Sequence, residues 1–428
     1  METIFYPDRK DFDRLCSRNI PADDPGVTAA VESIVADVAV RGDEALREYA
    51  LRFDGVSLDS FELTPAEIDE GASRVDGETA RAIDAAAGQI RIFHEAQRPA
   101  PLRVESIPGV VCEQRPVPIR TVGLYIPGGR APLFSTVLML GIPARIAGCR
   151  NVVMCTPQSG SAPIAPEILY AARVAGIDKI YRIGGAQAVA AMAYGTASVP
   201  RVDKIFGPGN RFVTKAKQLV TSVTAIDMPA GPSEVMVLAD HTARPDFIAS
   251  DMLSQAEHGP DSQAMLVTDS PSLAEAVVDE VGRQSRLLSR AESVAGSLSS
   301  SRIIVTRSRE EAIDFANMYA AEHLIINMEN PREAAMEIDA AGSVFIGPYS
   351  PESAGDYASG TNHTLPTGGW ARSMSGVNLE SFMRRITYQQ LTPDGLASLA
   401  PVITAMAEAE GLDAHAAAVT VRLKSFEK

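Results

Sequence analysis

The feature that most constrains the fold is an alternation of short apolar strands and helices in the middle of the chain. Residues 121–126 form an apolar run that ends in a glycine turn, and an apolar helical segment follows over about 134–147. This order repeats several times, at a spacing that indicates a parallel, doubly wound α/β sheet. Strands are predicted at 121–126, 151–156, 179–183, 204–206, 224–227, 235–239, 263–268, 303–306, 324–327 and 343–346.

Glycine-rich turns follow nearly every strand between 120 and 235, as in Gly184-Gly185 and Gly207-Pro208-Gly209. Ligands of open α/β sheets bind at this edge, and glycine lets backbone amides approach a phosphate. A nucleotide site is one interpretation, and tight loops that need glycine are the other. The G-x-G-x-x-G fingerprint is absent, as is a clear acidic partner about 20 residues beyond one, so a standard dinucleotide site is not supported.

Composition limits the partners. The 428 residues carry a net charge of −15, which argues against binding to nucleic acid because phosphate contacts need a basic surface. No run of 18 apolar residues and no secretory signal is present, so we expect no membrane span and a cytoplasmic protein. The four cysteines show no C-x-x-C spacing and are expected to be reduced.

A helix is predicted over residues 247–256, and Gly259-Pro260 ends it beside His258. Gln255 and His258 are three residues apart, so both side chains leave one face of the helix. An amide oxygen and an imidazole at a helix end can share a divalent metal, with two positions left to fill. A capped helix end with an incidental histidine is the plainer interpretation of this pair taken alone.

The other histidines offer further ligands or a general base if the fold brings them together. Glu322-His323 stands where a strand begins, so an extended backbone would point the two side chains to opposite sides. His363 lies in a glycine-rich loop, and His415 lies near the end of the chain. Each of these alone is more often structural. The six histidines are His94, His241, His258, His323, His363 and His415.

Long motifs in order along the whole chain resemble those of the histidinol dehydrogenase family. They include the runs 123–129, 184–188 and 206–210, followed by 227–234 and 253–263. Towards the end of the chain the matching runs are 321–324, 350–363 and 409–415.

The resemblance implies oxidation of L-histidinol through L-histidinaldehyde to L-histidine, with reduction of two NAD and a bound zinc ion. It implies Glu322 and His323 as the acid–base pair, and Tyr125, Gln187 and Asn210 as contacts of NAD. Zn(2+) would be held by Gln255, His258, Asp356 and His415, the last from the second subunit of a homodimer with a shared active site. The implied substrate contacts are Ser233, Gln255, His258, His323, Glu352, Asp356, His363, Glu410 and His415.

The same resemblance implies two incomplete, doubly wound Rossmann-like α/β domains. We expect an N-terminal helical arm over 1–24 and an NAD-binding domain over 121–233. A discontinuous zinc-binding and catalytic domain is expected from 25–120 together with 234–376. A helical tail over 377–428 would make dimer contacts.

Three rival functions remain open on the sequence. A relative on the same fold could oxidise another small alcohol, although the full set of ligands favours a substrate with an imidazole. Acidic residues and histidines around zinc could equally activate water in a hydrolase. A metal-stabilised binding module without turnover is the third rival.

Overall fold

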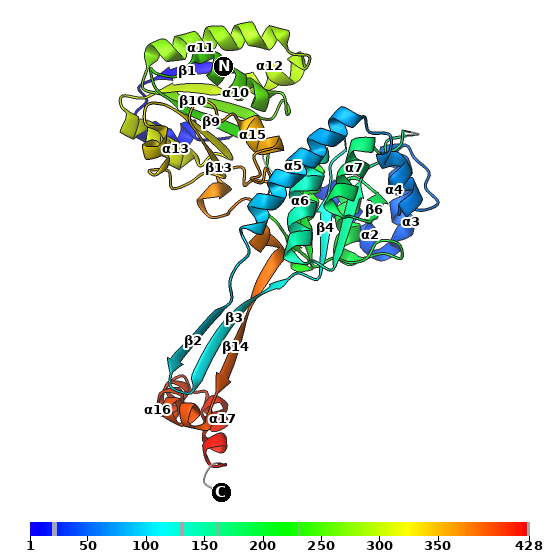
Figure 1. Ribbon diagram of the computed structural model, residues 1–428, viewed down its shortest axis with the longest axis vertical. Coiled ribbons are helices and arrows are strands. Elements are labelled where there is room, and N and C mark those ends of the chain that lie inside the picture. The colour runs from blue at the N-terminus through cyan, green and yellow to red at the C-terminus, as the bar shows by residue number, and fades with distance from the viewer. Residues whose placement is uncertain (19–23, 129–131, 161, 230, 426–428) are drawn as a thin grey trace.

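The computed structural model describes residues 1–18, 24–128, 132–160, 162–229 and 231–425. Two parallel sheets, of five and six strands, form the body of the molecule, and a narrow antiparallel arm projects from it (Figure 1). The prediction of two doubly wound α/β units is therefore confirmed. No helix in these ranges has both the length and the apolar character needed to cross a bilayer.

The five-stranded sheet has the order β6-β5-β4-β7-β8, with all neighbours parallel. Its apolar strands are closed by the glycine turns that the sequence predicted. The strands are β4 (Thr121–Tyr125), β5 (Asn151–Thr156), β6 (Lys179–Arg182), β7 (Lys204–Phe206) and β8 (Ala225–Ile226). The helices between them are α6 (Phe134–Ala147), α7 (Pro166–Ala175), α8 (Gly185–Tyr194) and α9 (Arg211–Leu219), with the short turn η3 (Val220–Ser222).

Helices from the first hundred residues cover this same sheet. They are α2 (Pro25–Arg41), α3 (Asp43–Tyr49), the π-helical turn η2 (Ala50–Asp54), α4 (Pro65–Ala72) and α5 (Gly77–Glu95). Helix α2 packs on α8 and α9, α4 on α7, and α5 on α6. The apolar side chains of α2, including Val31 and Val38, share one core with the alanines of α8. The expected grouping of 25–120 with 234–376 is thus wrong for these helices, because their apolar faces are buried on the other unit.

The six-stranded parallel sheet has the order β1-β11-β10-β9-β12-β13. Its strands are β1 (Glu2–Phe5), β9 (Glu234–Ala239), β10 (Gln263–Thr268), β11 (Arg302–Val305), β12 (His323–Asn327) and β13 (Ser343–Ile346). Its larger helices are α10 (Pro245–Ala256), α11 (Pro271–Gln284), α12 (Ala291–Ser300) and α13 (Arg309–Tyr319). Shorter elements are α14 (Pro331–Ala335), α15 (Glu352–Tyr357), η4 (Ser285–Leu287) and η5 (Trp370–Arg372). The turn η6 (Leu379–Phe382) packs instead on α6 of the five-stranded unit.

The N-terminal segment is not the helical arm that was predicted. Strand β1 forms the edge of the six-stranded sheet, where Glu2 pairs with Arg302. The short helical turns η1 (Arg9–Asp11) and α1 (Phe12–Leu15) follow, and the Phe12 ring packs edge-on against Phe315 with centroids 5.0 Å apart. The N-terminus is thereby fixed to the sheet, and residues 19–23 of the expected arm lie outside the described ranges.

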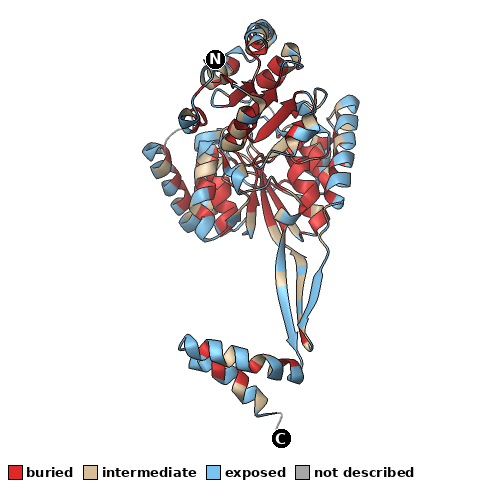
Figure 2. Ribbon diagram, turned by 90° about the vertical axis from the view of Figure 1, so that its left-hand side faces the viewer, coloured by how far each residue is buried: buried red, intermediate tan, exposed pale blue. Residues whose placement is uncertain are grey.

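The projecting arm is a three-stranded antiparallel sheet of β2 (Leu102–Ile107), β3 (Val110–Pro118) and β14 (Met383–Leu391), in the order β14-β3-β2. It ends in α16 (Pro393–Ala409) and α17 (Asp413–Leu423), so the tail is α-helical only beyond β14. The outer strands β2 and β14 are largely exposed and the central strand β3 is mostly half-buried (Figure 2). The exposure of β14 explains why it lacks the alternation of apolar and polar residues that predicts a strand.

Candidate active site

Glu322 and His323 lie where strand β12 begins, at the amino edge of the six-stranded sheet, and both side chains are buried. The backbone of Glu234, at the start of the neighbouring strand β9, holds both. Its N–H donates to Glu322 Oε2 over 2.8 Å, and its carbonyl oxygen lies 3.1 Å from His323 Nδ1. Since a carbonyl only accepts, Nδ1 carries a proton, and Nε2 of the neutral ring is the free base.

The two side chains do not point to opposite sides, as an extended backbone would require. Glu322 Oε2 lies 3.7 Å from His323 Nδ1. Glu322 precedes the first residue of strand β12, so the alternation of side chains within the strand does not apply to it.

Two more carboxylates surround His323. Glu352 Oε1 lies 3.5 Å from Nδ1, and Asp356 Oδ1 lies 3.6 Å from Nε2. Both carboxylates come from helix α15, four residues apart and hence on one face. His258, just beyond the end of α10, adds its Nε2 at 4.0 Å from Asp356 Oδ2. We call His258, Glu322, His323, Glu352 and Asp356 the carboxylate–histidine cluster.

Burial and mutual charge perturb the pKa values of this cluster. Burial alone would lower the pKa of His323, but Glu322, Glu352 and Asp356 outweigh it and raise that pKa to about 10. Burial raises the pKa of Glu322 to about 7 and that of Glu352 to about 8. Burial also acts on Asp356, but the neighbouring His323 outweighs it and lowers the pKa of that carboxyl, so a negative group that suits a cation is kept in the cluster.

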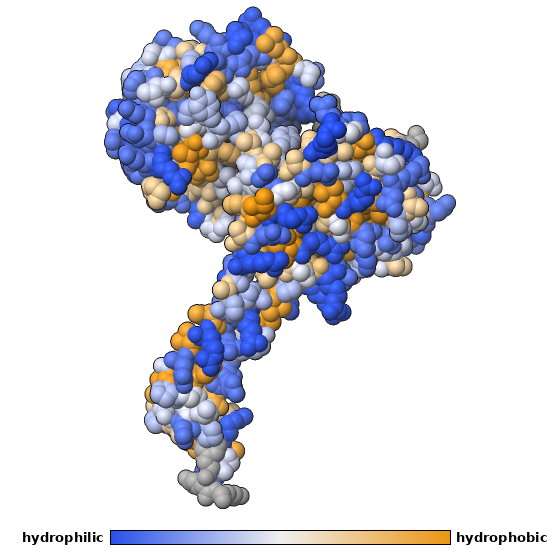
Figure 3. All heavy atoms as spheres, in the orientation of Figure 1, coloured by the Kyte–Doolittle hydropathy of each residue, from blue (hydrophilic) through white to orange (hydrophobic). Residues whose placement is uncertain are grey.

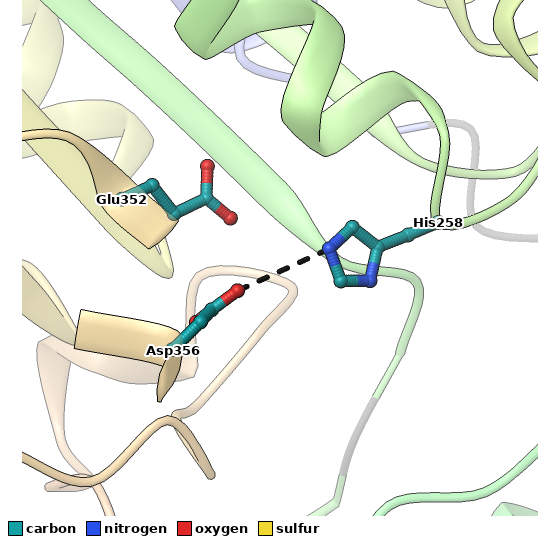
Figure 4. A group of neighbouring side chains, drawn as sticks. All are labelled: His258, Glu352 and Asp356. Atoms are coloured by element: carbon teal, nitrogen blue, oxygen red, sulfur yellow. Dashed lines mark ion pairs between the residues drawn. The ribbon is translucent and has the colours of Figure 1, made fainter. Parts of the chain in front are cut away.

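The cluster has the ligands and the free atoms that a metal needs. One ligand atom each from His258, Glu352 and Asp356 lies within 4.8 Å of the others, and Figure 4 shows these three side chains turned toward one another. One turn before His258, both amide atoms of Gln255 are buried without a hydrogen-bond partner among the described residues. Glu352 Oε2 and His323 Nε2 lack one as well. Leaving such atoms unpaired is costly, so the arrangement fits a zinc ion and a polar substrate.

The remaining implied substrate residues divide into two groups. His363 adjoins the cluster, because its Nδ1 lies 3.0 Å from the backbone oxygen of Asp356. Ser233 immediately precedes Glu234 at the same edge of the sheet and is half-buried. Glu410 and His415 are exposed at the far end of the arm, remote from the cluster of their own chain (Figure 1).

The three implied NAD contacts line one cavity of about 930 Å³ at the carboxyl edge of the five-stranded sheet. Tyr125 ends β4, Gln187 lies in the first turn of α8, and Asn210 caps α9 by accepting from the N–H groups of Phe212 and Val213. The Tyr125 hydroxyl accepts from the N–H of Gly185 over 3.0 Å, which joins the two glycine turns. None of the described residues lining the cavity belongs to the carboxylate–histidine cluster.

Two sets of contacts that the sequence did not predict involve residues around the carboxylate–histidine cluster. The Glu234 carboxylate is held by the buried Arg18 guanidinium at 2.7 Å, and Arg18 also stacks over the Tyr319 ring. Thr136, near the start of α6, lies 3.2 Å from His363 Nε2 and links the five-stranded unit to the cluster. A charged residue at the head of an otherwise apolar strand, Glu234, was the one signal that the sequence offered.

A nucleotide-sized cavity on one parallel sheet, beside a buried acid–base and metal-ligand cluster on another, defines the class as a two-domain α/β enzyme. The comparisons identify which one. The model of the histidinol dehydrogenase family matches residues 18–423. The chain belongs to that family, whose members are NAD-dependent oxidoreductases that convert histidinol to histidine.

Individual relatives agree with the family match. Histidinol dehydrogenase of Vibrio parahaemolyticus is 54% identical over 417 residues, covering 97% of this chain and 96% of the relative. That of Bacteroides fragilis is 53% identical over 429 residues, covering all of both chains. The crystal structure of histidinol dehydrogenase from Elizabethkingia anophelis superposes with a TM-score of 0.97 at 47% identity, covering 100% of this chain and 99% of that one.

Proposed function

We propose that this enzyme oxidises L-histidinol to L-histidine at a zinc site on the carboxylate–histidine cluster, with Glu322 and His323 as the acid–base pair. The observation that carries the proposal is the set of buried, unpartnered polar atoms on Gln255, His323 and Glu352. In this proposal Zn(2+) is held by Gln255, His258 and Asp356, with His415 of the partner subunit as the fourth ligand.

Zinc, when bound, would supply a cation suited to nitrogen donors such as those of histidinol, and so would position the substrate rather than activate the reacting oxygen. Ser233, Glu352 and His363 lie at the same edge of the sheet and would contact the substrate. Glu410 of the partner subunit would complete these contacts.

His323 moves the protons. A base needs the neutral ring, and a cation bound at Asp356 would oppose the carboxylates that raise the pKa of His323 to about 10. In the first step Nε2 then takes the alcohol proton while two electrons leave the carbon as hydride for the nicotinamide of NAD, giving the aldehyde. Glu322 activates a water that adds to the aldehyde, and the hydrate loses a second hydride to a second NAD with a proton again taken by His323. Four electrons thus reduce two NAD. Burial, which raises the pKa of Glu322 to about 7, suits this residue to exchanging a proton near neutral pH.

The arm supports a homodimer with a shared active site. Exposed large apolar side chains gather along it, and Figure 3 shows hydrophobic residues on its visible face. They are Leu102, Val104, Tyr388, Leu391, Val402, Met406, Leu412 and Val421. A second copy that covers this surface would bring its Glu410 and His415 to a cluster that lacks them.

A cytoplasmic location belongs to the same proposal. Cys16, Cys149 and Cys155 are buried as free thiols, and burial raises the pKa of Cys149 to about 12. Inert, reduced thiols of this kind are typical of a reducing compartment.

The decisive experiment counts NADH formed per histidinol consumed on enzyme of measured zinc content. We expect two NADH per histidinol and loss of activity when a chelator removes the zinc, with recovery on adding zinc back. A ratio of one would contradict the four-electron reaction, and a hydrolysis product without NADH would favour the zinc hydrolase.

A further inference from the structure

One carboxylate in the cavity of the five-stranded sheet has no role in the proposed reaction. Asp54 ends the turn η2 and lines the cavity together with Tyr125, Gln187 and Asn210. Its backbone oxygen accepts from the N–H of Gly160 over 2.7 Å, which fixes its position. Within the described parts of the chain no hydrogen bond or ion pair reaches its carboxylate, whose pKa is raised by burial to about 6.

The location of Asp54 indicates which end of a dinucleotide it would meet. Helix α3, which η2 continues, lies on the side of the five-stranded sheet turned away from the six-stranded sheet (Figure 1). Thr136, by contrast, reaches His363 and marks the side that faces the cluster. A dinucleotide whose nicotinamide approaches His323 must therefore extend its adenosine half toward Asp54.

The geometry points to Asp54 as the residue that selects NAD over NADP, by accepting hydrogen bonds from the hydroxyls of the adenosine ribose. This inference rests on the proposed binding of NAD in this cavity. A carboxylate is an acceptor only, so it pairs with a ribose diol and repels the dianionic 2′-phosphate of NADP. Dinucleotide-binding sheets elsewhere use an acidic residue for the same task, but place it after the glycine fingerprint that this chain lacks.

Arg52 is the other charged residue on the described lining of the cavity, and it could act in the opposite sense by attracting a phosphate. Its side chain is exposed, and its guanidinium lies over the ring of Phe53 at 5.1 Å from the centroid. We place Arg52 at the solvent-exposed mouth of the cavity, where screening by solvent and salt leaves its charge little influence on the 2′ position. Arg52→Ala should then leave the ratio of kcat/KM for NAD to that for NADP unchanged.

The test compares kcat/KM for NAD and for NADP, with histidinol saturating, in the wild type and in Asp54→Asn. The matched control is Asp59→Asn, which removes the same charge from an exposed residue outside the cavity lining. We expect Asp54→Asn to lower kcat/KM for NAD by about tenfold to a hundredfold. The ratio of kcat/KM for NAD to kcat/KM for NADP should fall by at least the same factor. The KM for histidinol and the melting temperature should stay as in the wild type, and Asp59→Asn should change nothing.

An unchanged NAD-to-NADP preference in an Asp54→Asn enzyme that still turns over would overturn the inference, as would a change of preference in Arg52→Ala alone. Asp54→Ser, with calorimetric binding of NAD and NADP, gives the same readout if the asparagine variant is unstable. Failure of the underlying proposal looks different. In that case Gln187→Ala and Asn210→Ala would leave the KM for NAD unaffected, or the wild type would form no NADH.

Discussion

At the scale of single residues, the structure separates groups that do chemistry from groups that hold position. Glu322 and His323 are both clamped by the Glu234 backbone, so their side chains are set before a substrate arrives. Preorganisation of this kind means that replacing either group should remove proton transfer without disturbing the site around it.

We expect Glu322→Gln and His323→Asn each to lower kcat by about 100- to 10,000-fold, the usual contribution of a general acid or base. Zinc content and histidinol affinity should remain near those of the wild type. Steady-state rates, metal analysis and calorimetric titration with histidinol measure the three quantities. A variant that kept its full rate would favour the metal-stabilised binding module or a different base.

A buried ion pair between α9 and the segment that follows β8 should control stability instead. Lys217 and Asp227 pair with side-chain exposures of 3% and 1%, and Lys217 also donates to the backbone oxygen of Gly207 over 2.8 Å. Lys217→Met would leave Asp227 charged and unpaired, at a cost of about 3–5 kcal/mol in unfolding free energy. Arg9→Met breaks the exposed pair with Asp314 and should cost less than about 1 kcal/mol. Thermal and urea unfolding measure the loss of unfolding free energy in each variant. Equal losses in the two would show that burial does not determine how much an ion pair stabilises this enzyme.

At the scale of elements, the strand-to-helix turns of the five-stranded sheet depend on glycine in one place above all. Gly207 has a φ of 118°, and a Cβ there would overlap the carbonyl oxygen of Tyr125. Gly88 is a contrast, since it lies exposed inside α5 with open space where a Cβ would point.

Gly207→Ala should therefore destabilise the enzyme by at least 1–3 kcal/mol, roughly the cost of the strained backbone alone. It should also raise the KM for NAD, because it displaces the turn that carries Asn210. Gly88→Ala should stabilise α5 by about 0.5–1 kcal/mol through helix propensity. Melting temperatures measure both the expected loss of stability in Gly207→Ala and the expected gain in Gly88→Ala. A stable Gly207→Ala enzyme with normal NAD kinetics would contradict the role given to this turn.

The same elements show what a sequence can predict. Buried strands such as β5 and β10 are continuous apolar runs bounded by turn residues, and these were predicted correctly. The amphipathic faces of α2 and α5 predicted burial but not which sheet would cover them. Strand β14, exposed on both faces, gave no periodic signal.

The candidate site, like the fold, was only partly predictable from the sequence. The resemblance supplied the residues, and the structure brings those of α10, α15 and β12 together. The approach of the Glu322 and His323 side chains to each other, where β12 begins, has no signature in residue type. The clamp by the Glu234 backbone could not be predicted either, because every residue offers the same backbone atoms.

At the scale of the whole molecule, the separation between the arm tip and the cluster makes the proposed site a property of two chains. This can be tested by mixing two inactive variants. His415→Ala should lose zinc and activity, and His323→Asn should lose activity alone. After both are unfolded and refolded together, heterodimers should contain one intact site, formed by His323 of one chain and His415 of the other. We expect recovery to roughly a quarter of the wild-type rate for random pairing.

Variants refolded separately and then mixed without exchange serve as the control. If both residues acted within one chain, co-refolding would restore nothing. Unchanged zinc content in His415→Ala would also count against that ligand.

The pairing of β1 with β11 has a consequence for the order in which the chain acquires its structure. Glu2 is synthesised first but finds its partner only when Arg302 emerges, while residues 25–226 already contain every strand and covering helix of the five-stranded sheet. Local contacts form sooner than distant ones, so we expect the unit of 25–226 to fold during synthesis while the first strand waits. Strand β1 can join the six-stranded sheet only after β11 has emerged, so the opening residues of the chain complete a unit assembled mainly from its later part.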